Sequence, residues 1–217
     1  MSYNPITVWS HALGPNPFKA IIALEELGVP YEKVIVENPK DAAFTAINPN
    51  GRLPAIKDPN NNNLILWESG AILEYIIETY DKEKKLTSTQ SPDKWYLKQY
   101  LHFQMSGQGP YFGQLVWFHK FHPEDVPAAK KRYLEQTARV FEVLDKILQG
   151  KKYLVADKCT YADLSFIPWD VAVKALLPEV WKGFDVENKY PNYAAWHARL
   201  IARPSVQKTY EKFPGWV

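Results

Sequence analysis

The segments Arg52-Leu53-Pro54-Ala55 and Trp67-Glu68-Ser69-Gly70-Ala71-Ile72 decide the fold of this 217-residue chain. Between them, the apolar runs 54–57 and 64–67 are predicted strands, separated by Asp58-Pro59 and four asparagines. Asparagine tolerates the left-handed backbone of a tight turn, so the stretch predicts a β-hairpin. A helix follows at once, because apolar side chains recur at helical spacing after the Glu-Ser pair. A Leu-Pro step therefore opens the hairpin and a Glu-Ser pair closes it.

The residues upstream of the hairpin alternate between strand and helix patterns. The apolar run 6–9 predicts a buried strand, and the β-branched content of 31–36 predicts a second one. Between them we expect Asn16 to cap a helix that begins at Pro17 and ends before Gly28. One or two helical turns precede the hairpin. The order β-α-β-α-β-β-α predicts an α/β domain with a small mixed sheet.

The pattern changes near residue 83, which divides the chain into two predicted domains. Residues 1–83 form the α/β domain, the polar stretch 84–92 is a linker, and 93–217 has helical periodicity throughout. We expect the second domain to be all-α. The glycines and proline of Gly107-Gln108-Gly109-Pro110 are expected to kink its first long helix and open a pocket beside it.

Composition excludes several classes of protein. Net charge is +2 and the basic clusters are short, which argues against nucleic acid as a partner. No run approaches the roughly 20 apolar residues that span a membrane, and the first residues lack a signal-peptide pattern, so we expect a cytoplasmic protein without a membrane partner. Cys159 is the only cysteine, which excludes an intrachain disulfide and a Cys-x-x-Cys pair, and we expect no metal. Any thiol chemistry must use a thiol from another molecule.

The succession of strand, Leu-Pro, hairpin, Glu-Ser and helix resembles the glutathione transferase superfamily, and the likeness extends over the whole chain. Within it, the sequence resembles the fungal class related to the yeast nitrogen-catabolite regulator and the bacterial nu class. The motifs that carry this likeness are Ser10-His11, Gly14-Pro15-Asn16, Asn48-Pro49-Asn50, 67–72 and 103–110. The resemblance implies a thioredoxin-like domain followed by a helical one, glutathione as substrate or bound ligand, and usually a homodimer.

Glutathione is an extended tripeptide, so its site needs three kinds of group. An extended backbone can pair with the cysteinyl amide, and Leu53 before Pro54 supplies one. Ser69 at a helix start offers a hydroxyl and backbone amides to the γ-glutamyl carboxylate, while Glu68 takes the ammonium. Lys40 or Arg52 is the candidate cation for the glycyl carboxylate.

Each of these residues also has a structural interpretation when taken singly. Ser69 fits a simple N-cap, Glu68 a first-turn acid and Pro54 an ordinary strand start. Their joint order is what favours a ligand site.

The resemblance assigns the position beside the glutathione sulfur to Asn16, the predicted catalytic residue. Bacterial relatives often carry threonine two residues earlier, where this chain has Gly14, and Ser10 and His11 remain alternatives for contacting the thiol. Lowering the pKa of a thiol by about two units takes roughly 2.7 kcal/mol of preferential stabilisation of the thiolate. The Asn16 amide and the amides at the helix start are candidates to supply it.

Acceptor specificity is expected from the helical domain, with Phe112 and Trp169 as predicted lining residues. Thr160 and Asp163 form a capping-box pattern that opens a helix, and Cys159 beside it is expected to be buried. The leading hypothesis is an enzyme that activates glutathione for conjugation, peroxide reduction or disulfide reduction. The alternative is a non-catalytic regulatory protein that binds glutathione. The chain lacks the Asn-rich segment that precedes the fold in the yeast regulator, and this favours the enzyme.

Overall fold

The computed structural model describes residues 3–11, 14–213 and 215–217. The chain divides into two compact units, Met1–Thr87 and Ser88–Val217, each with its own core. Within the described residues no helix is long and apolar enough to cross a membrane.

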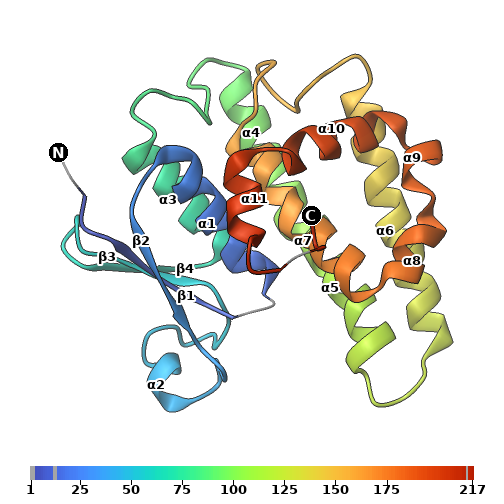
Figure 1. Ribbon diagram of the computed structural model, residues 1–217, viewed down its shortest axis with the longest axis horizontal. Coiled ribbons are helices and arrows are strands. Elements are labelled where there is room, and N and C mark those ends of the chain that lie inside the picture. The colour runs from blue at the N-terminus through green and yellow to red at the C-terminus, as the bar shows by residue number, and fades with distance from the viewer. Residues whose placement is uncertain (1–2, 12–13, 214) are drawn as a thin grey trace. The chain divides into compact units, whose positions relative to one another are not determined.

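The first unit is a four-stranded mixed sheet with three helices (Figure 1). Its elements are β1 Ile6–Ser10, α1 Pro15–Leu27, β2 Tyr31–Ile35, α2 Ala42–Thr45, β3 Ala55–Asp58, β4 Leu64–Trp67 and α3 Ser69–Tyr80. The strand order is β2-β1-β3-β4, with β1 parallel to β2 and antiparallel to β3, and β3 antiparallel to β4. Helices α1 and α3 pack against each other and against the sheet. The predicted thioredoxin-like α/β fold is confirmed.

The start of α1 differs from the prediction. The helix begins at Pro15 with Gly14 at the N-cap, so Asn16 is the second helical residue and not the cap. Two prolines fit in one first turn because the N–H groups there have no intrahelical partner to lose. The consequence is a donor-poor helix start, since Pro15 and Pro17 carry no N–H and the N–H of Gly14 bonds to the carbonyl of His11 (3.4 Å).

The hairpin forms as predicted. Asn62 and Asn63 occupy its turn with left-handed backbone (φ 51° and 56°), a conformation that asparagine tolerates better than most residues. Tyr75 and Tyr80 of α3 both donate hydrogen bonds to Asp58 at the end of β3, which ties the hairpin to the helix. The C-terminal half of the helix that follows the hairpin is therefore held against it.

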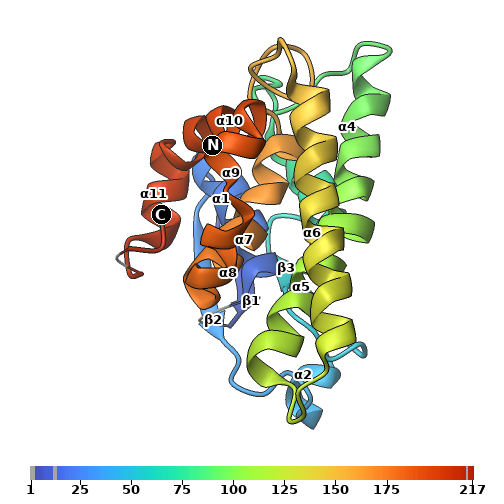
Figure 2. The same cartoon turned by 90° about the vertical axis from the view of Figure 1, so that its right-hand side faces the viewer.

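The second unit is entirely helical, as predicted. Its elements are α4 Asp93–Phe103, α5 Gly109–Val116, α6 Pro127–Leu148, α7 Tyr161–Leu176, α8 Pro178–Phe184, α9 Val186–Lys189, α10 Pro191–Ile201 and α11 Pro204–Tyr210. Figure 2 shows the long helix α6, which packs against α5. Phe141 of α6 is at the centre of the core and contacts the rings of Phe112, Phe184 and Tyr193.

The interruption predicted at Gly107 to Pro110 takes a different form. Helical backbone continues from α4 into α5 through the π-helical turn Gln104–Gln108, and a second π-helical turn, Trp117–Phe121, ends the segment. A π turn moves the hydrogen-bond acceptor one residue further back, which accommodates a proline that lacks an N–H without ending the helix. The glycines and the proline thus change the type of helix here without breaking it.

The capping box that opens α7 is confirmed. Both the N–H and the hydroxyl of Thr160 donate to Oδ2 of Asp163, at 2.9 and 2.6 Å. Oδ1 of the same carboxylate accepts from the N–H of Leu154 (2.9 Å) and from Nε1 of Trp196 (2.8 Å). Cys159, immediately before the box, is buried, in agreement with the sequence prediction. This motif is part of the core of the helical unit.

Candidate functional site

The start of α3 combines a buried hydroxyl with helix amides that no described side chain caps. Ser69 is 3% exposed and is the first residue of the helix, preceded by Glu68 with an exposed side chain. No side chain of the described residues caps this end of the helix, so its amides and its positive dipole end stay open to an anion. Glu68 has φ 73° and ψ 114°, a conformation that costs a non-glycine residue about 1–3 kcal/mol. Such strain at an exposed acidic residue is typical of a functional position.

Lys19 of α1 lies beneath this helix start. Its side chain is 1% exposed, and Nζ donates a hydrogen bond to Oγ of Ser69 at 3.3 Å. Burial lowers the pKa of the Lys19 amine to about 7, while the nearby Glu68 carboxylate acts in the opposite direction. A buried amine and a surface carboxylate thus flank Ser69.

The two predicted cations lie on different loops, Lys40 before α2 and Arg52 before β3. Asn48 is 1% exposed, and its side chain donates to the carbonyl of Arg52 (2.6 Å) while accepting the N–H of Asn50 (3.0 Å). Nζ of Lys40 donates to the carbonyl of Asn50 at 3.1 Å, and the Asn50 amide donates to Oε1 of Glu68 at 3.4 Å. Gly51 has φ 57°, and a Cβ there would lie 3.2 Å from Nζ of Lys40. The loop before β3 therefore joins Lys40 and Glu68 through Asn50.

Leu53, for which the sequence predicted an extended backbone, lies two residues before β3. The Leu53-Pro54 peptide bond is cis. Across the described stretches of the chain, neither the N–H nor the carbonyl of Leu53 bonds to another backbone group. Both groups are thus available at the edge of the site, where a main-chain partner can pair with them.

The structure shows different surroundings for Ser10 and Asn16, two of the three candidates for contact with a thiol. Ser10 is 0% exposed at the end of β1, and its hydroxyl donates to the carbonyl of His11 at 3.2 Å. Asn16 is half-buried in the first turn of α1. Because Gly14 is the cap, the role of N-cap no longer competes for the Asn16 side chain. This geometry favours Asn16 over Ser10.

The two rings predicted for the acceptor pocket lie in different surroundings within the helical unit. Phe112 is 0% exposed and packs edge-on against Phe141, so the structure places it in the hydrophobic core. Trp169 of α7 is half-buried and lies against α5, where a Cβ at Gly109 or Gly113 would come within 3.3 or 3.1 Å of its indole. These two glycines are one helical turn apart and form the surface on which the indole rests.

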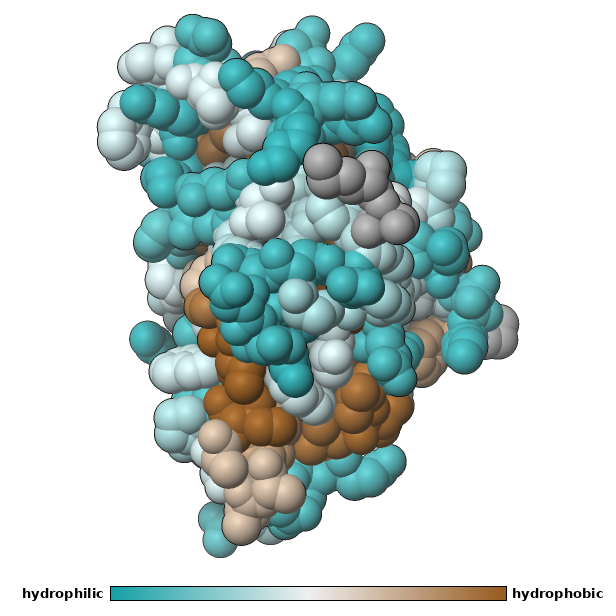
Figure 3. Space-filling view, turned by 90° about the vertical axis from the view of Figure 1, so that its left-hand side faces the viewer, coloured by the Kyte–Doolittle hydropathy of each residue, from teal (hydrophilic) through white to brown (hydrophobic). Residues whose placement is uncertain are grey.

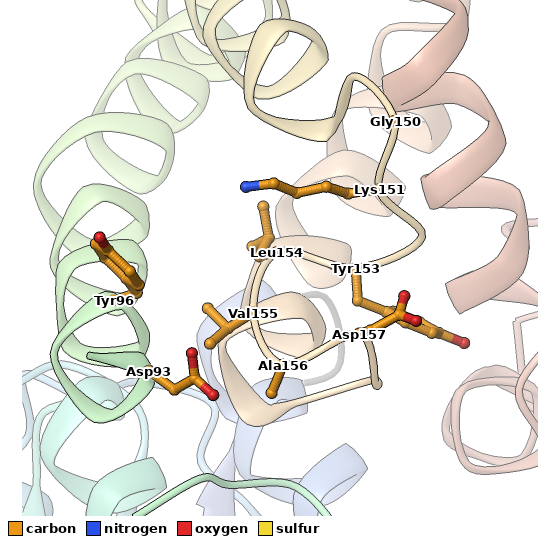
Figure 4. Close-up of a pocket in the computed structure, with 9 residues that line it drawn as sticks. All are labelled: Asp93, Tyr96, Gly150, Lys151, Tyr153, Leu154, Val155, Ala156 and Asp157. Atoms are coloured by element: carbon orange, nitrogen blue, oxygen red, sulfur yellow. The ribbon is translucent and has the colours of Figure 1, made fainter. Parts of the chain in front are cut away.

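Each unit also has a cavity away from these residues. One of about 260 Å³ lies between β2 and α2, in a region where apolar side chains such as Ile35 are exposed. Apolar surface also gathers in the lower half of the face shown in Figure 3. The second, of about 380 Å³, lies between α4 and the loop 150–157, and Figure 4 shows Lys151 extending toward α4 and Tyr153 pointing the other way. Neither cavity contains a residue that the sequence nominated.

Lys19 is the residue of this site that sequence reasoning missed. A signal existed, because it is the only charged residue in a run of buried residues from Pro17 to Leu24. A lysine within such a run is either at its edge, with the amine reaching water, or buried beside a partner. The distinction depends on the contact with Ser69, 50 positions further along the chain.

Comparisons with known proteins identify the family to which this geometry belongs. Residues 4–78 match the glutathione S-transferase N-terminal domain and residues 110–204 match the glutathione S-transferase C-terminal domain. Glutathione S-transferase 2 of Schizosaccharomyces pombe is 44% identical over 218 residues, covering 95% of this chain and 95% of that protein. The chain belongs to the glutathione S-transferase family.

Solved structures similar to this chain include fungal proteins named after Ure2p, in agreement with the sequence resemblance. Glutathione transferase URE2P6 from Phanerochaete chrysosporium, in complex with oxidized glutathione, has a TM-score of 0.91 and 38% identity, covering 98% of this chain and 97% of that one. Ure2p5 from the same organism, cocrystallized with 1-(S-glutathionyl)-2,4-dinitrobenzene, has a TM-score of 0.89 and 42% identity, covering 98% and 96%.

Proposed function

We propose that this chain binds glutathione at the start of α3 and activates its thiol for attack on an electrophilic acceptor. The observation that carries the proposal is the arrangement around Ser69, with open helix amides, the buried amine of Lys19 on one side and the Glu68 carboxylate on the other. This arrangement matches the zwitterionic γ-glutamyl end of the tripeptide. The carboxylate binds Ser69 and the α3 amides, and the ammonium binds Glu68.

The loops before α2 and β3 offer groups for the other two residues of glutathione. The cysteinyl residue pairs with the backbone of Leu53 ahead of Pro54, and Lys40 or Arg52 takes the glycyl carboxylate. The hydrogen bond from Lys40 to the Asn50 carbonyl keeps that ammonium beside the loop, which supports Lys40 as one of the two.

Asn16 is the proposed catalytic residue, donating its side-chain amide to the sulfur. With prolines at the first and third helical positions, the backbone of this helix start contributes few donors, so the stabilisation of the thiolate rests more on the Asn16 amide than the sequence suggested. The thiolate then attacks an electrophilic carbon. In the reaction with 1-chloro-2,4-dinitrobenzene a C–S bond forms and chloride leaves with the C–Cl electron pair.

Conjugation is favoured because the ligand crystallized with Ure2p5 is the thioether that such a displacement produces. Reduction of a disulfide is the second candidate, because URE2P6 is in complex with oxidized glutathione. There the thiolate attacks one sulfur, the other sulfur leaves as a thiolate, and a second glutathione completes the reduction. Trp169, set against α5, is the proposed contact for a hydrophobic acceptor.

Three assays on the purified full chain separate these activities and the regulatory alternative. Conjugation of 1-chloro-2,4-dinitrobenzene, reduction of cumene hydroperoxide and reduction of hydroxyethyl disulfide are each followed with glutathione in excess. We expect conjugation to be present. Binding of glutathione with no rate in all three assays would leave the non-catalytic regulatory protein as the function.

The role of Asn16 is tested by the pKa of the bound thiol. Asn16→Ala removes the side-chain donor, so the pKa should rise by about one to two units, as measured by the ultraviolet absorbance of the thiolate across a pH series. Asn188→Ala, a change at an exposed asparagine of the helical unit, is the matched control and should leave the titration unchanged. An unaltered titration in Asn16→Ala removes Asn16 from the mechanism.

For the assembly we propose a homodimer. Both units expose large aromatic side chains, with Trp67 at 37%, Trp95 at 59% and Tyr96 at 46%. Exposed rings of this size are typical of surfaces that meet another protein. Light scattering after gel filtration should give twice the 25.0 kDa chain mass, and a mass of one chain contradicts the proposal.

A further inference from the structure

Asn50 is an exposed residue that contacts two charged groups of the proposed site. Its side-chain amide donates to Oε1 of Glu68 at 3.4 Å, and its backbone carbonyl accepts from Nζ of Lys40 at 3.1 Å. Glu68 and Lys40 have opposite charges and lie in separate segments of the first unit. Asn50 has no part in the glutathione contacts proposed above.

The turn that carries Asn50 is held by its backbone. Asn48, which is 1% exposed, donates its N–H to the carbonyl of Phe44 (2.9 Å), and its own carbonyl accepts the N–H of Gly51 (2.8 Å). Oδ1 of Asn48 also accepts the N–H of Asn50 at 3.0 Å. Gly51 has φ 57°, and a Cβ there would lie 2.9 Å from the carbonyl oxygen of Pro39. The side chain of Asn50 takes no part in these contacts, so the turn does not depend on it.

The Glu68 carboxylate needs a partner to hold it in one place. Its side chain is exposed and long, although the backbone at this residue is fixed with φ 73°. Holding such a side chain in one conformation reduces its entropy. Among the side chains that the structure describes, the Asn50 amide is the one that hydrogen-bonds to this carboxylate, and no lysine or arginine among them forms an ion pair with it. The Asn50 amide therefore selects a direction for the carboxylate before a ligand arrives.

The hydrogen bond from Asn50 leaves the carboxylate able to bind an ammonium. It is long, at 3.4 Å, and it uses one oxygen, whereas an ionised carboxylate can accept about four hydrogen bonds. A neutral amide adds no charge that would repel an ammonium. A lysine or arginine at this position would instead pair with Glu68 and compete with the ligand.

Resting on the proposed function, in which Glu68 takes the ammonium of the γ-glutamyl residue, we propose that Asn50 is a positioning residue for that contact. It holds the Glu68 carboxylate where the ammonium arrives, so that binding does not have to order the side chain at that moment. Asn50 thereby increases the preference of the site for a γ-glutamyl group that carries its α-amino group.

The test compares two peptides that differ only in that ammonium, glutathione and glutaryl-cysteinylglycine. Both are used as S-methyl derivatives, which removes thiol ionisation and oxidation, and are titrated into the full chain at pH 7 by isothermal titration calorimetry. The wild type should bind the glutathione derivative more tightly. Asn50→Ala should weaken that binding by about three- to tenfold and leave the binding of the glutaryl peptide unchanged. Equal weakening of both peptides, or of neither, overturns the inference.

The substitution at Asn50 is confined to one hydrogen bond. The other contacts of this residue, with Asn48 and Lys40, are made by its backbone N–H and carbonyl, which alanine keeps. Asn61→Ala, at an exposed asparagine of the hairpin turn, is the matched control and should bind both peptides as the wild type does.

A second background tests whether Asn50 acts through Glu68. Glu68→Gln removes the charge that binds the ammonium, so adding Asn50→Ala to it should weaken the binding of S-methylglutathione by less than about twofold. A loss as large as in the wild-type background would mean that Asn50 acts on the ligand by another route, and it overturns the inference.

The same titrations distinguish this inference from the proposed function. If the wild type binds neither peptide, the proposed site is wrong and the inference fails with it. Equal affinity of the wild type for the two peptides contradicts the role proposed for Glu68, and with it that of Asn50. A preference for the glutathione derivative that Asn50→Ala retains in full contradicts only the role of Asn50.

Discussion

The two units of this protein both bury ionisable side chains, but they surround them differently. In the first unit the amine of Lys19 donates to the hydroxyl of Ser69 and lies near the Glu68 carboxylate, beside a helix start that no described side chain caps. In the helical unit the carboxylate of Asp163 accepts four hydrogen bonds. We interpret the buried carboxylate with four hydrogen bonds as structural, and we propose that the buried amine beside an uncapped helix start and a surface carboxylate belongs to a ligand site.

Asp170, which follows Asp163 in the same helix α7, has hydrogen bonding intermediate between that of Lys19 and that of Asp163. It is 0% exposed and accepts a hydrogen bond from Nε2 of Gln108 at 2.8 Å. His197 is the nearest basic group (3.8 Å), and burial lowers its pKa to about 4, so it is neutral at pH 7. Burial raises the pKa of Asp170 to about 8, which makes it a neutral acid at pH 7. Burial without an opposite charge nearby therefore keeps the Asp170 carboxyl protonated and neutral.

The largest effect is expected from breaking the fully satisfied carboxylate. Asp163→Asn replaces one acceptor oxygen with an NH₂ group that faces two donors, whichever way the amide is oriented. We expect a loss of about 3–5 kcal/mol in the free energy of unfolding, measured in urea at pH 7. Asp170→Asn is the matched change in the same helix. It should lower the free energy of unfolding at pH 7 far less, because the asparagine amide resembles the protonated Asp170 carboxyl. Equal losses would show that hydrogen-bond count does not separate the two sites.

The second prediction concerns the pH dependence of Asp170. Its folded-state pKa lies above the unfolded value, so its contribution to stability is complete below about pH 4 and is lost as pH rises toward 8. Asp170→Asn removes this loss. Between pH 5 and pH 8 the free energy of unfolding of the variant, measured in urea, should rise relative to that of the wild type by at most about 1.4 kcal/mol per pH unit. A constant difference over that range would contradict a raised pKa.

Lys19 should show the opposite slope in the ligand-free protein. Its folded-state pKa lies below the unfolded value, so stability is lost as pH falls from about 10.5 toward 7. Lys19→Met should therefore stabilise the protein at pH 7, by about 1–3 kcal/mol, and the gain should shrink toward pH 9.5. Urea unfolding without glutathione measures this. Destabilisation at pH 7 would mean that the amine is already fully compensated by the protein.

The smallest effect is expected at the surface that supports Trp169. In Gly113→Ala the new Cβ would lie 3.1 Å from Cη2 of the indole, which must shift. We expect a cost of about 1 kcal/mol and a few-fold change in KM for a hydrophobic acceptor, with the KM for glutathione unchanged. Gly183→Ala, in α8 with nothing near its Cβ, is the control and should stabilise slightly. Equal changes in both KM values would contradict a role confined to the acceptor.

The sequence predicted the first unit well because its signals are local. The turn asparagines at 62 and 63, the Leu53-Pro54 step and the start of α3 after Glu68 each depend on neighbours within a few residues. The start of α1 was misjudged because two prolines in one first turn fit either Pro15 or Pro17 at the first helical position.

Features that depend on distant contacts were beyond the reach of the sequence. Lys19 meets Ser69 only when α1 and α3 pack together. The burial of Phe112 likewise depends on α6, which brings Phe141 against it. Between Gln104 and Gln108, periodicity could not distinguish a kink from a π-helical turn, because glycine and proline permit both.

The burial of Cys159 affects how this protein withstands its own chemistry. Its single cysteine is enclosed at the start of α7, so the reactive sulfur in the proposed reaction belongs to the tripeptide. An over-oxidised or alkylated sulfur would then leave with the ligand and be replaced at the next encounter, whereas a protein-borne thiol would be lost for the life of the chain. Oxidation would then damage glutathione, which is replaced, and the protein would stay active in conditions that inactivate enzymes with an exposed catalytic cysteine.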